Sequence, residues 1–116
     1  MYNLIYSPLA DEDLTAIYNY IATDSPARAS AYMDKMEQSI LKLRDFPNMG
    51  AEGRYPELIN LGVKVLPFDD YLIFYTVNAA AEQVRIVRVL HGSVNYRRLL
   101  KNFDTTDNVV FDNYNI

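Results

Sequence analysis

The sequence predicts an α+β domain in which a hairpin of two helices packs against one antiparallel sheet. Apolar side chains recur with the three- to four-residue period of amphipathic helices between residues 9 and 43. Between residues 62 and 90 the period changes to two residues, which is typical of strands. When helices and strands are segregated in this way, the helices pack on the sheet and each element buries one of its faces. We therefore expect the order strand, helix, helix, strand, strand, strand and short helix.

The N-terminal elements have well-marked boundaries. Residues 2–6 form a short apolar and aromatic run that suits a first strand, which should join the sheet at one edge. Ser7 can then cap a helix whose first position is Pro8. A helix is predicted over residues 9–22, with one apolar face formed by Leu14, Ile17, Tyr18 and Ile21.

The second helix begins with the same signal, a serine followed by a proline, at Ser25 and Pro26. Only two residues separate it from the first helix, so the two should pack as an antiparallel hairpin. Its apolar stripe consists of Ala29, Tyr32, Met33, Met36, Ile40 and Leu43, and Phe46-Pro47 ends it. At this periodicity, core packing explains the tyrosine and the methionines better than a ligand-binding stripe does.

The remaining elements follow a loop predicted over residues 47–60, which are rich in proline, glycine and asparagine. Strands are predicted over residues 62–67, 71–77 and 83–90. The middle strand is apolar at nearly every position, which is typical of a strand covered on both faces, so it should lie at the centre of the sheet.

The C-terminal part is predicted to be a short helix over residues 93–101, capped by Ser93, with Arg98 in its last turn. We expect residues 1–101 to form one domain and residues 102–116 to be an acidic tail. The sequence leaves open whether this tail is an added edge strand or a disordered end.

The composition narrows the class of protein. The 116 residues include no cysteine and carry a net charge of −4. We expect no disulfide, no cofactor and no metal site, and a soluble cytoplasmic protein without a membrane segment. Binding through nucleic-acid phosphates needs clustered lysine and arginine, so direct sequence-specific binding to nucleic acid is not expected. Residues 50–101 are nevertheless locally basic, with 7 basic and 5 acidic side chains.

The stretch that could carry chemistry is residues 84–100, where a predicted strand meets the last helix. It contains the only histidine and a group of cations, and its candidate residues are Arg88, His91, Tyr96, Arg97 and Arg98. RNA cleavage by attack of the 2′-hydroxyl needs a proton acceptor, a proton donor and fixed positive charge, which these side chains could supply.

A structural role competes with this interpretation. Arg88 shares its strand side with Val84, Ile86 and Leu90, so it could be a buried or interface arginine paired with an acid. Tyr96 could simply pack beside Leu99. For each residue taken singly, the structural role is the stronger prediction. Asp69-Asp70 is likewise better explained as a solvated turn than as a metal-binding pair.

Four motifs together resemble the RelE/ParE superfamily of toxins from bacterial toxin–antitoxin pairs. They are Tyr6-Ser7-Pro8-Leu9-Ala10, Pro47-Asn48-Met49-Gly50, Tyr71-Leu72-Ile73-Phe74-Tyr75 and Arg88-Val89-Leu90-His91-Gly92. The resemblance implies a cytoplasmic toxin that is neutralised by a cognate antitoxin, whose extended segment wraps the helical hairpin and the sheet. The antitoxin contacts that it implies here are Leu14, Ile17, Tyr18, Tyr32 and Met36.

Two activities occur in this superfamily, and the sequence is more similar to the ParE branch. RelE-like members cut messenger RNA on the ribosome and carry an arginine just after a tyrosine of the central strand, where this chain has Leu72. They also carry several lysines on the preceding strand, where this chain offers only Lys64. ParE-like members poison DNA gyrase by protein contact.

Three functions are therefore open from the sequence. The first is a gyrase-directed toxin whose contact patch is Arg88, His91, Tyr96, Arg97 and Arg98. The second is a ribosome-dependent endoribonuclease that uses Tyr96 with Arg88 and Lys64. The third is a non-toxic binding module that is retained for its antitoxin.

Overall fold

The computed structural model describes residues 1–100, except for the side chains of Tyr96 and Arg97, and the acidic tail lies outside the described residues. The helices are α1 (Pro8–Ala22), α2 (Pro26–Leu41), the 3-10 turn η1 (Lys42–Arg44), α3 (Pro56–Asn60) and α4 (Tyr96–Leu100). The strands are β1 (Asn3–Tyr6), β2 (Ala51–Glu52), β3 (Lys64–Phe68), β4 (Tyr71–Asn78) and β5 (Gln83–His91).

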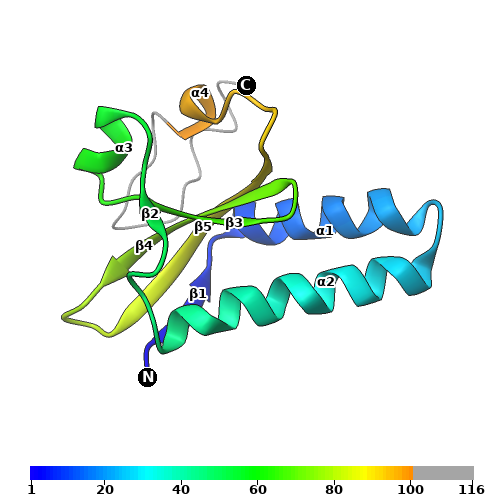
Figure 1. The fold of residues 1–116 in the computed structure, drawn as a ribbon, viewed down its shortest axis with the longest axis horizontal. Helices are drawn as coiled ribbons and strands as arrows, with labels where there is room; N and C mark the ends of the chain where they lie inside the picture. Colours follow the sequence, from blue (N-terminus) through cyan, green and yellow to red (C-terminus); the bar gives the residue numbers. More distant parts are fainter. Residues whose placement is uncertain (101–116) are drawn as a thin grey trace.

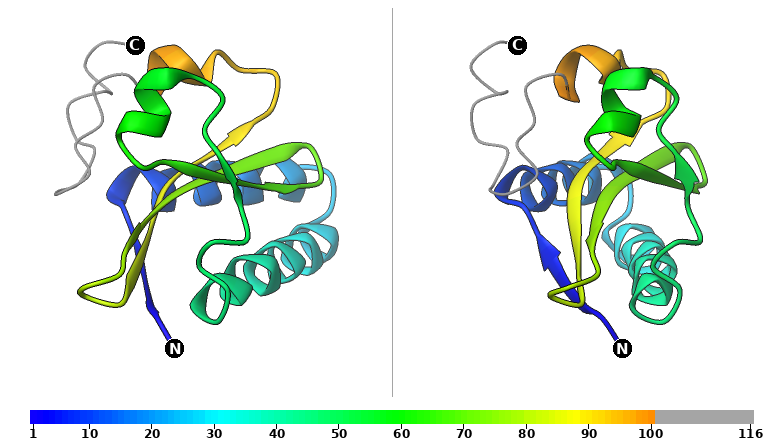
Figure 2. Two further views of the ribbon diagram at one scale, coloured as in Figure 1. Left: turned by 60° about the vertical axis from the view of Figure 1, so that its left-hand side comes forward. Right: turned by 90° about the vertical axis from the view of Figure 1, so that its left-hand side faces the viewer.

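Helices α1 and α2 form an antiparallel pair beside the sheet, while α3 and α4 lie at its other end (Figures 1 and 2). The predicted α+β class is confirmed.

The sheet has the order β1-β5-β4-β3-β2. Strand β1 pairs with β5 in parallel, and the other neighbours are antiparallel. The N-terminal strand thus joins the meander at one edge, and β4 lies at the centre, as the sequence predicts. The central position of β4 agrees with its nearly continuous apolar run, in which Ile73, Phe74 and Tyr75 are buried from both faces of the sheet.

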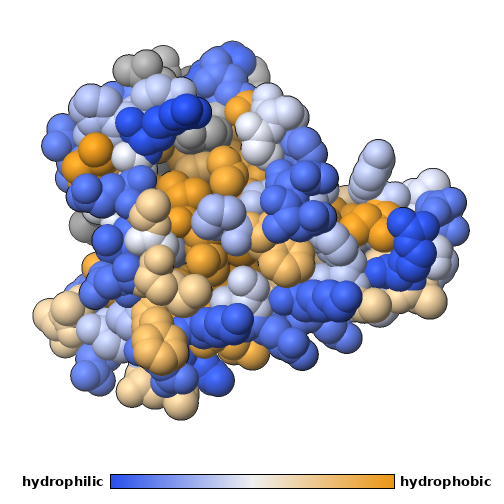
Figure 3. Space-filling model, in the orientation of Figure 1, coloured by the Kyte–Doolittle hydropathy of each residue, from blue (hydrophilic) through white to orange (hydrophobic). Residues whose placement is uncertain are grey.

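Two hydrophobic clusters cover the two faces of the sheet. On the face toward the helical hairpin, which we call the helical face, Ile73 and Tyr75 pack with Met36 and Ile40. On the opposite face, which we call the far face, Phe74 packs with residues that include Leu58 of α3 and Leu100 of α4. In the orientation of Figure 1, apolar side chains also gather over the middle of the visible surface and are surrounded by hydrophilic ones (Figure 3). Burial on both faces of the sheet supplies most of the hydrophobic stabilisation.

The prediction of a plain loop over residues 47–60 is wrong, because this segment contains β2 and α3. Its start is fixed by a close approach: the Gly50 amide donates to the Tyr75 hydroxyl at 2.9 Å, and a Cβ on Gly50 would lie 2.6 Å from that oxygen. Only glycine fits there. Helix α3 then buries Leu58 completely. Both elements are too short for a periodic signal and depend on these tertiary contacts.

A β-bulge in β5 corrects the predicted alternation. Phe74 pairs with Arg88 and Tyr75 with Ile86, so Val87 is left without a partner in the register. Directly paired residues point to the same face of a sheet. Arg88 therefore lies on the face of Phe74, away from Val84 and Ile86, which belong to the helical face.

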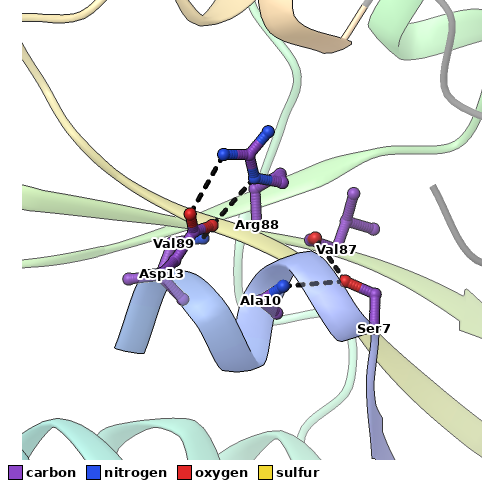
Figure 4. Close-up of polar contacts among 6 residues, drawn as sticks. All are labelled: Ser7, Ala10, Asp13, Val87, Arg88 and Val89. Atoms are coloured by element: carbon purple, nitrogen blue, oxygen red, sulfur yellow. Dashed lines mark hydrogen bonds and ion pairs between the residues drawn. The ribbon is translucent and has the colours of Figure 1, made fainter. Parts of the chain in front are cut away.

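The outer edge of β5 beyond β1 is closed by polar groups of α1 (Figure 4). The Ser7 amide donates to the Ile86 carbonyl at 3.0 Å, and the Ser7 hydroxyl donates to the Val87 carbonyl at 2.7 Å while accepting from the Ala10 amide at 3.0 Å. Ser7 thus caps the helix, as predicted, and satisfies the bulged strand at the same time. An unpaired backbone group in this position would be costly because the site is buried.

Asp13 continues this edge nearly two helical turns after Ser7. Its Oδ2 accepts from the Val89 amide at 2.9 Å and from Arg88 Nε at 2.8 Å, and its Oδ1 accepts from Arg88 Nη2 at 3.0 Å. The side chains of Arg88 and Asp13 are only 8% and 12% exposed. The pair is therefore shielded from solvent, and removing one partner would leave the other charge uncompensated.

We predict that Asp13→Asn lowers the free energy of unfolding by roughly 3 kcal/mol, because the buried Arg88 guanidinium loses its counterion. Urea denaturation of the purified protein measures this change. The matched control is Glu12→Gln, a neighbouring exposed acid on the same helix, which should change stability by less than about 0.5 kcal/mol. Equal effects of the two substitutions would contradict a structural role for the pair.

Candidate functional site

The candidate cations Arg88 and Lys64 are not brought together by the fold. Lys64 pairs with Tyr75, so it lies on the helical face, whereas Arg88 pairs with Phe74 on the far face. Arg88 is in addition bound to Asp13 and buried. The prediction that this arginine pairs with an acid is confirmed, and the geometry leaves its guanidinium with a structural role.

His91 ends β5 and is exposed. Its Nδ1 accepts from the Ser93 amide at 3.2 Å and lies 2.8 Å from the Ser93 hydroxyl. The neutral ring consequently carries its proton on Nε2. The Tyr71 ring packs edge to face against the imidazole, with centroids 5.4 Å apart and planes at 81°. His91 therefore lies on the helical side of the sheet end with a fixed ring orientation.

Helix α4 starts later than predicted, because Ser93 turns back toward His91 and does not cap it. Asn95 precedes the helix, and its Oδ1 accepts from the Arg98 amide at 3.3 Å. Leu100 is buried in the far-face cluster, and Arg98 is exposed. The predicted site residues Tyr96 and Arg97 form the first turn of α4, but their side chains lie outside the described residues.

A cleft of about 510 Å³ lies between the tip of the helical hairpin and the β3–β4 turn. It is lined by Tyr20, Ile21, Arg28, Tyr32, Asp69, Asp70, Tyr71 and His91. The Tyr32 hydroxyl donates to Asp69 Oδ2 at 2.7 Å and ties α2 to the turn. Burial, and then its bond to Asp69, raises the pKa of Tyr32. Burial also raises the pKa of Tyr71, with smaller contributions from Tyr20 and the two acids.

A second depression, which we call the hairpin groove, runs between α1 and α2 and has a volume of about 310 Å³. Its apolar lining is Tyr6, Leu14, Met33, Met36 and Ile40, and its acidic lining is Asp11, Asp34 and Glu37. Burial, followed by the charges of Glu37 and Asp11, raises the pKa of Tyr6.

The residues predicted to contact an antitoxin divide by burial. Tyr18 is exposed, and Leu14 and Tyr32 are half-buried. Ile17 is 7% exposed and Met36 is completely buried, because both pack against the sheet in the helical-face cluster. These two residues therefore stabilise the core, and in the unbound chain they present almost no surface to a partner.

The role of Asp13 is not among the predictions from the sequence, in which it appears as one of three consecutive acids with Asp11 and Glu12. A signal was nevertheless present. Asp13 lies four residues after Leu9 and four before Ile17, both of which are buried, so the helical period places its carboxylate on the packed face of α1. An acid in such a position requires a partner.

Within residues 1–100, no three histidine, cysteine, aspartate or glutamate side chains are grouped so that they could hold a metal ion. None of the helices in this part of the chain is long and apolar enough to cross a membrane.

The comparisons with known proteins agree with this architecture. The sequence model described as "ParE toxin of type II toxin-antitoxin system, parDE" matches residues 4–96. No curated protein matches the sequence. One similar solved structure is from a chromosomal ParDE TA system of P. aeruginosa, with a TM-score of 0.64, 23% identity and coverage of 78% of this chain and 96% of the other.

Another is from the RelBE2 toxin–antitoxin complex of Mycobacterium tuberculosis, with a TM-score of 0.56, 21% identity and the same coverages of 78% and 96%. At these identities the two structures support the fold alone. The family match extends from within β1 to the first residue of α4 and includes β2 to β5 and the whole helical hairpin. The chain therefore belongs to the ParE toxin family of type II toxin–antitoxin systems.

Proposed function

We propose that this protein is a toxin that arrests growth by binding DNA gyrase and that a cognate antitoxin neutralises it. The observation that carries this proposal against an RNase is the separation of its cations. Arg88 is held by Asp13 on the far face, and Lys64 lies on the helical face. A scissile phosphate would need such cations within reach of one another.

The contact surface that we propose is the end of the sheet where β5 passes into α4. Its members are His91, which is exposed and fixed by Tyr71 and Ser93, and Tyr96, Arg97 and Arg98 of α4. Aromatic and arginine side chains supply most of the energy of protein interfaces. Arg88 is not part of this surface but stabilises it, because its ion pair with Asp13 attaches β5 to α1.

The hairpin groove is the proposed antitoxin site. The apolar side chains that its lining leaves accessible, Tyr6, Leu14 and Met33, suit an amphipathic segment. The acids Asp11, Asp34 and Glu37 lie beside them. The toxin as a whole carries a net charge of −4. The complementary partner is a segment with apolar side chains toward the groove and basic side chains at its border.

We predict that the purified toxin blocks DNA supercoiling by gyrase and leaves ribosome-bound messenger RNA intact. Arg98→Ala should weaken the inhibition of gyrase about tenfold, as expected for an interface arginine. The control is Lys42→Ala, which removes an exposed cation from η1 and should have no effect. Cleavage of messenger RNA without inhibition of gyrase would overturn the proposal, and a toxin that never arrests growth would indicate a non-toxic binding module.

The endoribonuclease stays as the second candidate, because β5 delivers His91 to the same end of the sheet at which α4 begins with Tyr96. Removing the Tyr96 hydroxyl distinguishes RNA cleavage from inhibition by protein contact. We predict that Tyr96→Phe retains most of the growth arrest, since an interface keeps the packing of the ring. A complete loss of arrest, with the variant protein still folded, would favour proton transfer by Tyr96 and therefore RNA cleavage.

A further inference from the structure

The cleft at the tip of the helical hairpin combines aromatic rings with carboxylates. Tyr32 packs edge to face on Phe68 at 5.5 Å and on Tyr71 at 6.3 Å between ring centroids, and Tyr71 continues this contact to His91. Tyr20 also lines the cleft and is 79% exposed. Asp69 and Asp70 lie in the β3–β4 turn that forms the rim.

The turn is held in place from both sides, so the cleft is preformed. Asp69 adopts a φ of +53°, an unusual conformation for a residue other than glycine. Its carboxylate is fixed by the Tyr32 hydroxyl, and the Asp70 carbonyl accepts from the Gly92 amide at 2.9 Å. A preformed site spends little free energy on ordering when a ligand binds.

The charge of the cleft favours a cation. Asp69 and Asp70 contribute two carboxylates, whereas the single cation in the lining, Arg28, is already paired with Asp24 at 2.7 Å. Negative charge of this kind also contributes to the raised pKa values of Tyr32 and Tyr71. A planar guanidinium suits such a site better than an ammonium, because it stacks on aromatic rings and bonds carboxylates with two N–H groups.

We propose that this cleft receives an arginine side chain of the antitoxin, and that this arginine covers His91 when it binds. The proposal rests on the proposed function, since it assigns the cleft to the partner that neutralises the toxin. It explains how a segment seated on the helical hairpin would also block the β5–α4 end. The cleft has acids in its lining like the hairpin groove, so one basic partner is complementary to both.

The first test titrates the full-length toxin with the peptide acetyl-Gly-Arg-Gly-amide and with its uncharged citrulline analogue, by NMR. The arginine peptide should shift the ring resonances of Tyr20, Tyr71 and His91, and the citrulline peptide should bind more weakly. Tyr20→Leu and Asp70→Asn should each reduce affinity for the arginine peptide about two- to fivefold. The exposed controls Phe46→Leu and Glu12→Gln should not. Equal binding of the two peptides, or equal effects of variants and controls, would overturn the proposal.

The second test expresses the double variant Tyr20→Leu/Asp70→Asn in cells with the antitoxin encoded beside the toxin gene. The variant should still arrest growth but need more antitoxin for rescue. Loss of arrest in a variant that still folds would assign the cleft to the target, and unchanged arrest with an unchanged antitoxin requirement would exclude a role; both results contradict the proposal. If the unaltered toxin causes no arrest while the peptide result holds, the proposed function fails and the cation site stands.

Discussion

The structure depends on how the outer edge of β5 is closed. Strand β1 pairs with β5 only as far as Ile86, where the bulge at Val87 begins. From that point α1 takes over the role of a strand, with Ser7 binding the Val87 carbonyl and Asp13 binding the Val89 amide. Two polar side chains of one helix thereby fix the angle between the hairpin and the sheet. The cleft at the tip of the hairpin lies between the hairpin and the β3–β4 turn, so its position follows from this angle.

The same contact explains why a conspicuous cation is absent from the proposed contact surface. The bulge turns Arg88 to the far face, and the carboxylate of Asp13 then takes up two of its N–H groups as well as the adjacent backbone amide. A buried pair of this kind adds little net stability compared with apolar side chains, but it penalises any arrangement that separates the partners. We regard it as the device that specifies the register of α1 on β5.

Much of the fold could be predicted because its long elements carry strong periodic patterns. The serine–proline signals place both helix starts, and the apolar run of β4 predicts its central position. The features that could not be predicted depend on contacts between distant residues. Strand β2 and helix α3 are fixed by Gly50 against Tyr75 and by the burial of Leu58. The bulge that reorients Arg88 has no local sequence signal.

The candidate site could be predicted only where its residues lie within a single patterned element. The position of His91 at a strand end follows from local pattern, and the likeness in motifs led to the ParE family. The cleft that His91 lines was not foreseen, since Tyr20, Tyr32, Asp69 and Tyr71 come from three separate elements and a turn. In the sequence the tyrosines belong to apolar stripes and the acids to a turn. Only the packing of the hairpin beside the β3–β4 turn brings them together.

The central claim is that Arg88 supports the fold and does not touch the target. The most direct measurement is growth arrest by the double variant Asp13→Asn/Arg88→Met, whose folding is checked by urea denaturation. The asparagine retains an acceptor for the Val89 amide, and the methionine occupies the volume of the arginine stem without a charge. The account predicts that this variant folds and still arrests growth. A variant that folds as stably as the original protein but has lost its toxicity would contradict it.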